Sequence, residues 1–72
     1  MDTEKLLKTL KQYRKSMHLT QGELAARAGM STSFYGMLEL GKRRMTIDYL
    51  NRITEGLECS PLDLMIMAEE IG

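Results

Sequence analysis

The chain has 72 residues, enough for one domain and close to the lower limit for a domain that folds without disulfides or metals. One cysteine and one histidine exclude an internal disulfide and a Cys/His metal cluster. No apolar run approaches the roughly 20 residues of a membrane span, and the first residues, MDTEKLLK, lack the apolar segment of a signal peptide. We therefore expect a soluble, cytoplasmic protein, with no cofactor and no small-molecule ligand evident.

The formal net charge is zero, which taken alone argues against nucleic-acid binding, but the charges are distributed unevenly. Residues 1–44 carry nine Lys or Arg against four Asp or Glu, a balance of +5, whereas residues 45–72 carry one against six, a balance of −5. Such polarity suits a domain with one face toward phosphates and the other toward water or a partner. Ordinary solvated charge is the alternative interpretation.

A first helix is predicted over residues 3–17, with Thr3 as a candidate cap. Its apolar side chains recur at spacings of four, three and four and so form one stripe along a helix, made of Leu6, Leu10, Tyr13 and Met17. The lysines lie off this stripe. They are expected to form a solvated face, with one or two in reach of a phosphate.

Two short helices, predicted over residues 21–27 and 32–39, flank a glycine at position 29. Thr20 and Glu23 have the spacing of a capping box, and Ser31 can cap the second helix. Gly29 can adopt the left-handed conformation that a short turn between two steeply crossed helices requires. The segment therefore predicts a helix-turn-helix unit.

The second of these helices is the candidate reader of a DNA sequence. With Tyr35 facing inward, the side chains of Thr32, Ser33 and Met37 point outward, and the N-terminal part of such a helix meets base edges in the major groove. Thr32 and Ser33 can form hydrogen bonds with bases or phosphates, and Met37 can contact a thymine methyl group. Phe34 is exposed in this register, so it either contacts DNA or packs against the following helix.

The basic triplet Lys42, Arg43 and Arg44 follows the candidate reading helix, in a loop that begins at Gly41. Phosphate contacts are expected there, and Arg43 could also reach a base. Solvated charge is the alternative for the triplet. Gln21 occupies the first turn of the preceding helix, which by itself indicates a simple helix start.

Two more helices are predicted, over residues 47–57 and 61–70. Thr46 can cap the first of them, whose core face is predicted to consist of Ile47, Leu50, Ile53 and Leu57. The final helix is apolar on nearly all sides, although a terminal helix of a small domain has one face to bury internally. We therefore expect its surplus apolar side chains to form a dimer interface, made of Leu64, Met67, Ala68 and Ile71.

The chain resembles the phage Cro and repressor family of helix-turn-helix proteins over roughly residues 5 to 66. The usual sequence pattern of the family is "LTQ-x-ELA-x-x-AG-hydrophobic-S". It is matched by Leu19-Thr20-Gln21, Glu23-Leu24-Ala25 and Ala28-Gly29-Met30-Ser31. Glu39-x-Gly41-Lys42-Arg43 resembles the Glu-x-Gly-x-Arg that closes the motif. Within the family, the segment from Arg44 to Ser60 is most similar to controller proteins of restriction–modification systems.

The resemblance implies an all-α fold, a compact five-helix, lambda-repressor-like DNA-binding domain that occupies residues 1–72, with the helix-turn-helix at the second and third helices. It also implies that Arg14 pairs with Glu39, tying the first helix to the end of the reading helix. Gln21 would contact a phosphate and steady the base-reading side chains. Tyr35 stands where the family prefers isoleucine or valine, so its hydroxyl needs a partner when the ring is buried.

The leading hypothesis is a homodimeric, sequence-specific transcriptional regulator of a prokaryote or phage that binds double-stranded DNA at an inverted repeat and regulates its own gene. An antitoxin or adaptor protein would use the same fold to hold another protein, with the last helix as its docking surface. An enzyme is the weakest hypothesis, because no cluster of His, Cys and carboxylates has the spacing of metal ligands or of a triad.

Overall fold

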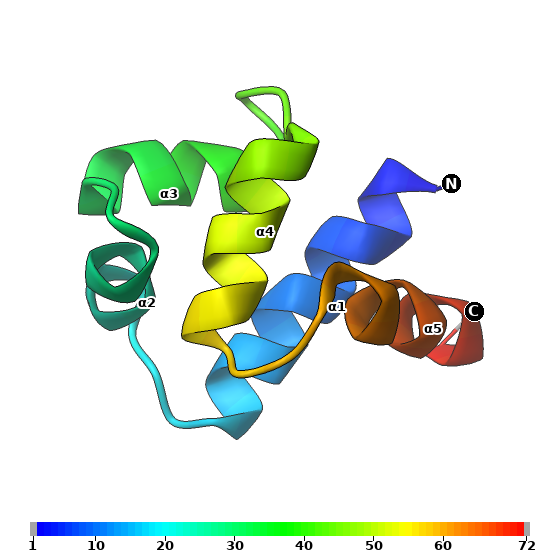
Figure 1. Cartoon of the computed structure of the whole chain (residues 1–72). Helices are drawn as coiled ribbons and strands as arrows, with labels where there is room; N and C mark the ends of the chain where they lie inside the picture. Colours follow the sequence, from blue (N-terminus) through cyan, green and yellow to red (C-terminus); the bar gives the residue numbers. More distant parts are fainter. Residues whose placement is uncertain (1, 72) are drawn as a thin grey trace.

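A computed structural model describes residues 2–71, apart from the side chain of Ile71. These residues form five helices and no strand, which confirms the predicted all-α class. The helices are α1 (Thr3–Ser16), α2 (Gln21–Ala28), α3 (Thr32–Glu39), α4 (Ile47–Gly56) and α5 (Pro61–Ile71). In Figure 1, α4 crosses the front of the molecule, with α2 and α3 on its left and α1 and α5 on its right. Within the described residues, every helix is too short or too polar to span a lipid bilayer.

Short polar side chains fix where the helices begin. At the start of α2, the Thr20 hydroxyl accepts a hydrogen bond from the Glu23 N–H at 3.0 Å, and the Thr20 N–H donates to the Glu23 carboxylate at 2.9 Å. This confirms the predicted capping box, and Ser31 and Thr46 also cap as expected. The predicted cap Thr3 is wrong, because the Asp2 carboxylate one residue earlier accepts the N–H bonds of the first turn of α1.

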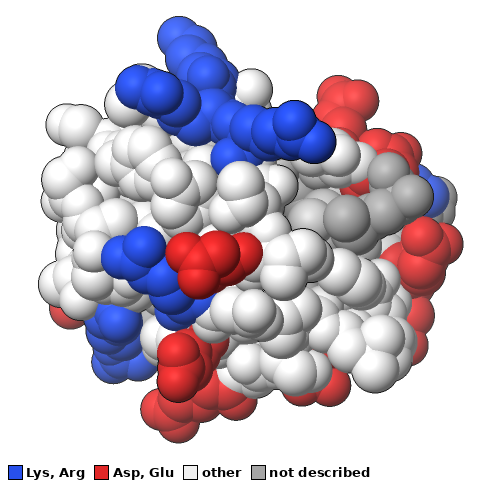
Figure 2. Space-filling model, turned by 45° about the horizontal axis from the view of Figure 1, so that its top comes forward, with Lys and Arg blue, Asp and Glu red and all other residues white. Residues whose placement is uncertain are grey.

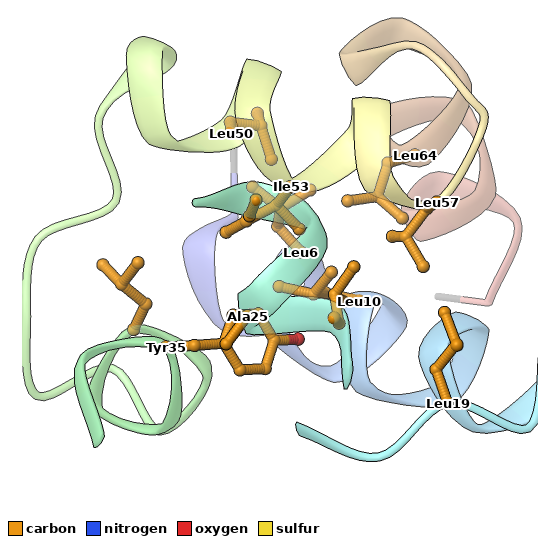
Figure 3. Packing of buried hydrophobic residues seen from close by; sticks show 12 residues of the cluster. Leu6, Leu10, Leu19, Ala25, Tyr35, Leu50, Ile53, Leu57 and Leu64 are labelled. Atoms are coloured by element: carbon orange, nitrogen blue, oxygen red, sulfur yellow. The ribbon is translucent and has the colours of Figure 1, made fainter. Parts of the chain in front are cut away.

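The interior is filled by apolar side chains from all five helices (Figure 3): Leu6 and Leu10, Ala25, Tyr35, Leu50 and Ile53, and Leu64. Ala25 is 1% exposed, and its small side chain lets α2 and α3 cross closely. One predicted core residue is misplaced. Ile47 at the start of α4 is 63% exposed, because the stripe that faces the core begins one turn later, at Leu50.

The apolar side chains of α5 are divided between two faces. Leu64 and Ala68, four residues apart, are 0% and 5% exposed because α5 packs against α1 and α4. Leu64 and Ala68, which were expected among the surplus side chains of a dimer interface, therefore belong to the internal core instead. Leu62 and Ile66, again four residues apart, carry the outer face and are 64% and 49% exposed. Met67 is half-buried, and the predicted interface side chain of Ile71 lies outside the described part of the chain.

Helices α2 and α4 cap each other's C-terminal ends. Arg52 of α4 donates from Nε to the Ala28 carbonyl at 2.9 Å and from Nη2 to the Gly29 carbonyl at 2.6 Å. In return, Arg27 of α2 donates to the Gly56 carbonyl at 3.0 Å. These bonds satisfy carbonyl groups that a helix end leaves without internal partners. A Cβ atom at Gly56 would lie 3.0 Å from the Arg27 Cβ, so close packing of α2 on α4 explains this glycine.

The chain leaves α4 through a left-handed residue that is not glycine. Gly29 and Gly41 adopt φ values of 71° and 78°, as expected for residues after a helix, but Glu58 does so with a φ of 59°. A residue with a Cβ atom is disfavoured in this conformation by about 1–2 kcal/mol. The backbone conformation that the fold requires at Glu58 is therefore unfavourable for this residue type.

Replacing this residue is expected to stabilise the protein. The Glu58→Gly variant should raise the free energy of unfolding by about 0.5–1 kcal/mol, because relief of the left-handed strain outweighs the greater freedom of glycine in the unfolded chain. Urea unfolding measures the change. The matched control is Glu55→Gly, which places glycine inside α4 and should cost about 1 kcal/mol. Destabilisation by both variants would contradict the interpretation.

Candidate nucleic-acid interface

The outer surface of α3 begins with two exposed hydroxyl side chains, Thr32 and Ser33, and continues with the half-buried Met37 one turn later. Thr32 packs against the start of α2, where a Cβ atom at Gly22 would lie 3.3 Å from the Thr32 Oγ1. Gly22 thus leaves room for the first side chain of α3. We call the surface formed by the exposed Thr32 and Ser33 and the half-buried Met37 the outer edge of α3.

A buried carboxylate joins α3 to α1 and α2. Glu39, the last residue of α3, accepts bonds from Arg14 Nε at 2.9 Å, from Arg14 Nη2 at 3.1 Å and from Gln21 Nε2 at 3.2 Å. The Tyr35 hydroxyl donates to the same carboxylate, and Arg14 donates from Nη1 to the Leu19 carbonyl at 2.7 Å. The expected pairing of Arg14 with Glu39 is confirmed, and the Tyr35 ring has the partner that its burial requires.

The hydrogen bonds of this network set the charge states of its members. Burial raises the pKa of Glu39, but the bonds from Arg14, Tyr35 and Gln21 together outweigh burial and hold that pKa below its ordinary value of 4.5. The hydrogen bond to Glu39 raises the pKa of Arg14. Burial first, and then the bond to Glu39, raises the pKa of Tyr35. At neutral pH the network therefore holds a carboxylate, a guanidinium and a neutral phenol.

Gln21 links this network to the outer surface. Its amide nitrogen donates to Glu39, and its amide oxygen lies on α3, 3.7 Å from the position that a Cβ atom of Gly36 would take. An amide nitrogen carries two hydrogens, so one remains for a phosphate or a base. The predicted DNA contact of Gln21 stays a prediction, with the side chain held in place by α3.

The basic loop folds back onto the end of α3. The N–H groups of Lys42 and Arg43 donate to the Met37 carbonyl at 2.8 and 3.3 Å, which sets the start of the triplet beside the outer edge of α3. All three basic side chains, including Arg44, are exposed. In Figure 2, one group of basic side chains covers the top of the view, a second lies at the lower left beside acidic ones, and further acidic side chains follow the right and lower edges. Within residues 2–71 the ion pairs are Arg14–Glu39 and Arg52–Asp48, so neither involves the triplet.

Phe34 is half-buried rather than exposed, because it packs against α4. Its ring centroid lies 5.1 Å from that of Tyr49, with the two rings inclined by 73°, an edge-to-face contact. The guanidinium carbon of Arg43 lies 5.8 Å from the Phe34 centroid. Tyr49 was missing from the sequence-based candidates. The signal for it was an aromatic residue off the apolar stripe of a helix that follows the basic loop directly.

We also searched the described residues for a metal site and for a reactive cysteine. They include no group of His, Cys, Asp and Glu that could hold a metal ion. Cys59 is partly buried against the core, and burial, with a smaller contribution from Asp63, raises the pKa of its thiol. A thiol with a raised pKa is a poor nucleophile, so Cys59 acts as a small apolar side chain.

Comparisons with known proteins identify the family of the chain. Residues 10–64 match the sequence profile of the Cro/C1-type helix-turn-helix family. The structure is similar to the clp gene regulator ClgR from Corynebacterium glutamicum, with a TM-score of 0.84 and 26% identity over 94% of this chain and 88% of that chain. It is also similar to the wild-type restriction–modification controller protein C.Esp1396I, with a TM-score of 0.87 and 26% identity over 94% and 87% of the two chains. No curated protein sequence matches the chain.

The buried carboxylate generates a prediction about stability and pH. Since the folded pKa of Glu39 is lowered, its contribution is complete above the ordinary value of 4.5 and is lost as the pH falls through the folded pKa. Glu39→Gln should lower the free energy of unfolding by about 3–5 kcal/mol at pH 7, because Arg14 then stays buried without its counter-charge. The difference from wild type should shrink steadily below about pH 5.

Urea unfolding between pH 7 and pH 3 measures both effects. Glu23→Gln is the control, because that carboxylate also has a lowered pKa, owing to its bond with the Thr20 backbone, but lies in water. Its cost should be much smaller. A difference between wild type and Glu39→Gln that stays constant down to pH 3 would show that Glu39 does not carry the charge assigned to it.

Proposed function

Because the chain belongs to the Cro/C1-type helix-turn-helix family of DNA-binding regulators, we propose that it is a sequence-specific transcriptional regulator acting in the cytoplasm. In this proposal it binds an inverted-repeat operator as a homodimer and regulates its own gene. One observation carries the proposal most directly. The three exposed basic side chains of the loop start beside the outer edge of α3, and neither ion pair of the described residues involves them.

Affinity is assigned to the basic loop. Lys42, Arg43 and Arg44 can each neutralise a phosphate and release a counterion, which makes binding tighter and dependent on salt. Their contribution is independent of base sequence, because phosphates carry no direct sequence information. The loop would therefore position α3 on any duplex, specific or not.

Sequence discrimination is assigned to the outer edge of α3. The sequence of this helix, TSFYGMLE, contains no basic residue, so the helix cannot supply the bidentate arginine contact that commonly reads guanine. Thr32 and Ser33 offer hydroxyl groups to base edges, and Met37 and the Thr32 methyl group can contact thymine methyl groups. The proposed operator half-site accordingly includes thymines at the positions that face α3.

Dimerisation is assigned to the outer face of α5. Leu62 and Ile66 are both exposed and lie one helical turn apart, which suits a self-complementary contact about a two-fold axis. A dimer with two reading helices about 34 Å apart would match one turn of duplex, and its operator would be an inverted repeat. These two residues replace Leu64 and Ala68 as the proposed centre of the interface.

Variants of the loop and of α3 test whether the loop supplies affinity and α3 supplies sequence discrimination. Arg44→Ala should weaken binding to specific and random duplexes by similar factors and lower the slope of log affinity against log salt by about one. Thr32→Ala, Ser33→Ala and Met37→Ala should instead relax discrimination at one or two base pairs by about 1–3 kcal/mol, with the salt slope unchanged. Titration of specific and random duplexes at several salt concentrations measures the first effect, and selection of operators from a random pool, seeded with the DNA upstream of the gene, measures the second. Unchanged preferences in all three α3 variants would remove α3 as the reader.

The assembly proposal is tested by a charge placed on α5. Ile66→Glu should give a helical monomer with weakened operator binding, because an unpaired carboxylate would be desolvated in the apolar interface. The control is Ile47→Glu, which places the same charge on another exposed isoleucine, and should remain dimeric. Sedimentation at micromolar concentration gives the answer. A wild-type chain that stays monomeric both free and on DNA would overturn the homodimer and leave α5 for a different partner.

A further inference from the structure

Three side chains from separate elements form one continuous contact beside α3. Tyr49 of α4 and Phe34 of α3 form an edge-to-face contact with ring centroids 5.1 Å apart, and the guanidinium carbon of Arg43 in the basic loop lies 5.8 Å from the centroid of the same Phe34 ring. Together with Arg44 and Thr46, these residues line a hollow of about 240 Å³ next to the reading helix. The aromatic contact thus reaches from the body of the domain to one member of the basic triplet.

At the α4 end of this contact, Tyr49 is held in place by its helix and by the core. The Thr46 hydroxyl accepts a hydrogen bond from the Tyr49 N–H at 3.1 Å, which fixes the first turn of α4 under the Tyr49 side chain. The rings of Tyr49 and Phe34 are both half-buried against the core. By contrast, Arg43 and Arg44 have exposed side chains, and among the described residues Arg43 is the cation found over an aromatic ring.

Contact with a ring affects an arginine in a particular way. A guanidinium attracted to an aromatic ring can still donate from N–H groups directed away from that ring, and phosphate oxygens accept such bonds. A long side chain loses freedom when it binds, so a guanidinium that is already held loses less. Arg43 should therefore bind a phosphate more strongly than an equally exposed arginine without an aromatic contact.

We propose that Tyr49 is a positioning residue for DNA binding, which acts through Phe34 to hold the Arg43 guanidinium toward a backbone phosphate. Arg44 binds phosphate from an unrestrained side chain. The inference rests on the proposed function, since it makes α4 part of the DNA-binding surface although Tyr49 itself need not touch DNA. It also makes Arg43 and Arg44 unequal, although they are adjacent and have the same charge.

The test is a pair of double-mutant cycles, read by fluorescence anisotropy with a random-sequence duplex at low salt. Tyr49→Leu should weaken binding about two- to five-fold, the range expected for one exposed cation–π contact. In the Arg43→Ala background the same change should have no further effect, whereas in the Arg44→Ala background it should keep its full effect. Tyr49→Phe, which retains the ring edge, should bind like wild type.

A second measurement needs no DNA. In the free protein, the NMR order parameter of the Arg43 Nε–Hε bond should exceed that of Arg44, and Tyr49→Leu should lower the first and leave the second unchanged. If Tyr49→Leu does not fold, Phe34→Leu with Phe34→Tyr as its conservative partner replaces it in both experiments.

Each outcome decides one point. Equal losses from Tyr49→Leu in both arginine backgrounds, or equal order parameters for the two arginines, would overturn the positioning role. A wild-type chain that binds no duplex at low salt would instead overturn the proposed function. In that case a higher order parameter for Arg43 would show the restraint itself without any DNA-binding role.

Discussion

The carboxylate of Glu39 is the constraint on which the arrangement of α3, the proposed reading helix, depends. A buried charge is tolerated when its hydrogen bonds are satisfied, and Glu39 receives four, from Arg14, Gln21 and Tyr35. Two of the three donor residues, Arg14 of α1 and Gln21 of α2, lie outside α3, so their bonds fix the C-terminal end of α3 relative to α1 and α2. Since the basic triplet starts three residues after Glu39, the same bonds fix the base of the loop that is proposed to bind phosphates.

Helix α4 supports the opposite end of the same unit. Arg52 holds the turn between α2 and α3 through the Ala28 and Gly29 carbonyls, while Tyr49, one turn earlier in α4, packs on Phe34 in the first turn of α3. The helix-turn-helix is thus held at three points. Arg52 bonds to its turn, Tyr49 packs on the start of α3, and Arg14 bonds to the end of α3. Such rigid support is what a reading helix needs if it is to discriminate base pairs by small differences in contact geometry.

The sequence was most informative where the determinants are local. Helix starts followed from side chains that cap their own first turn, such as Thr20 and Ser31, and the Arg14–Glu39 pair followed from the family resemblance. Packing partners were harder to predict because they depend on how helices cross. An apolar pattern around all of α5 could not indicate that Leu64 faces inward and Ile66 outward. Likewise, the two possible environments of Phe34 could be separated only when α4 was placed beside it.

The central claim is that the edge of α3 and the adjoining loop form the surface that meets DNA. Titration of the ¹⁵N-labelled chain with a duplex containing the DNA upstream of its gene tests this most directly, by mapping which backbone amide signals shift. We expect the largest shifts at Gln21, at residues 32–37 and at residues 42–44, with the outer face of α5 unaffected by DNA at fixed protein concentration. Shifts at Leu62 and Ile66 without shifts at residues 32–37 and 42–44, or no saturable shift in low salt, would contradict the account.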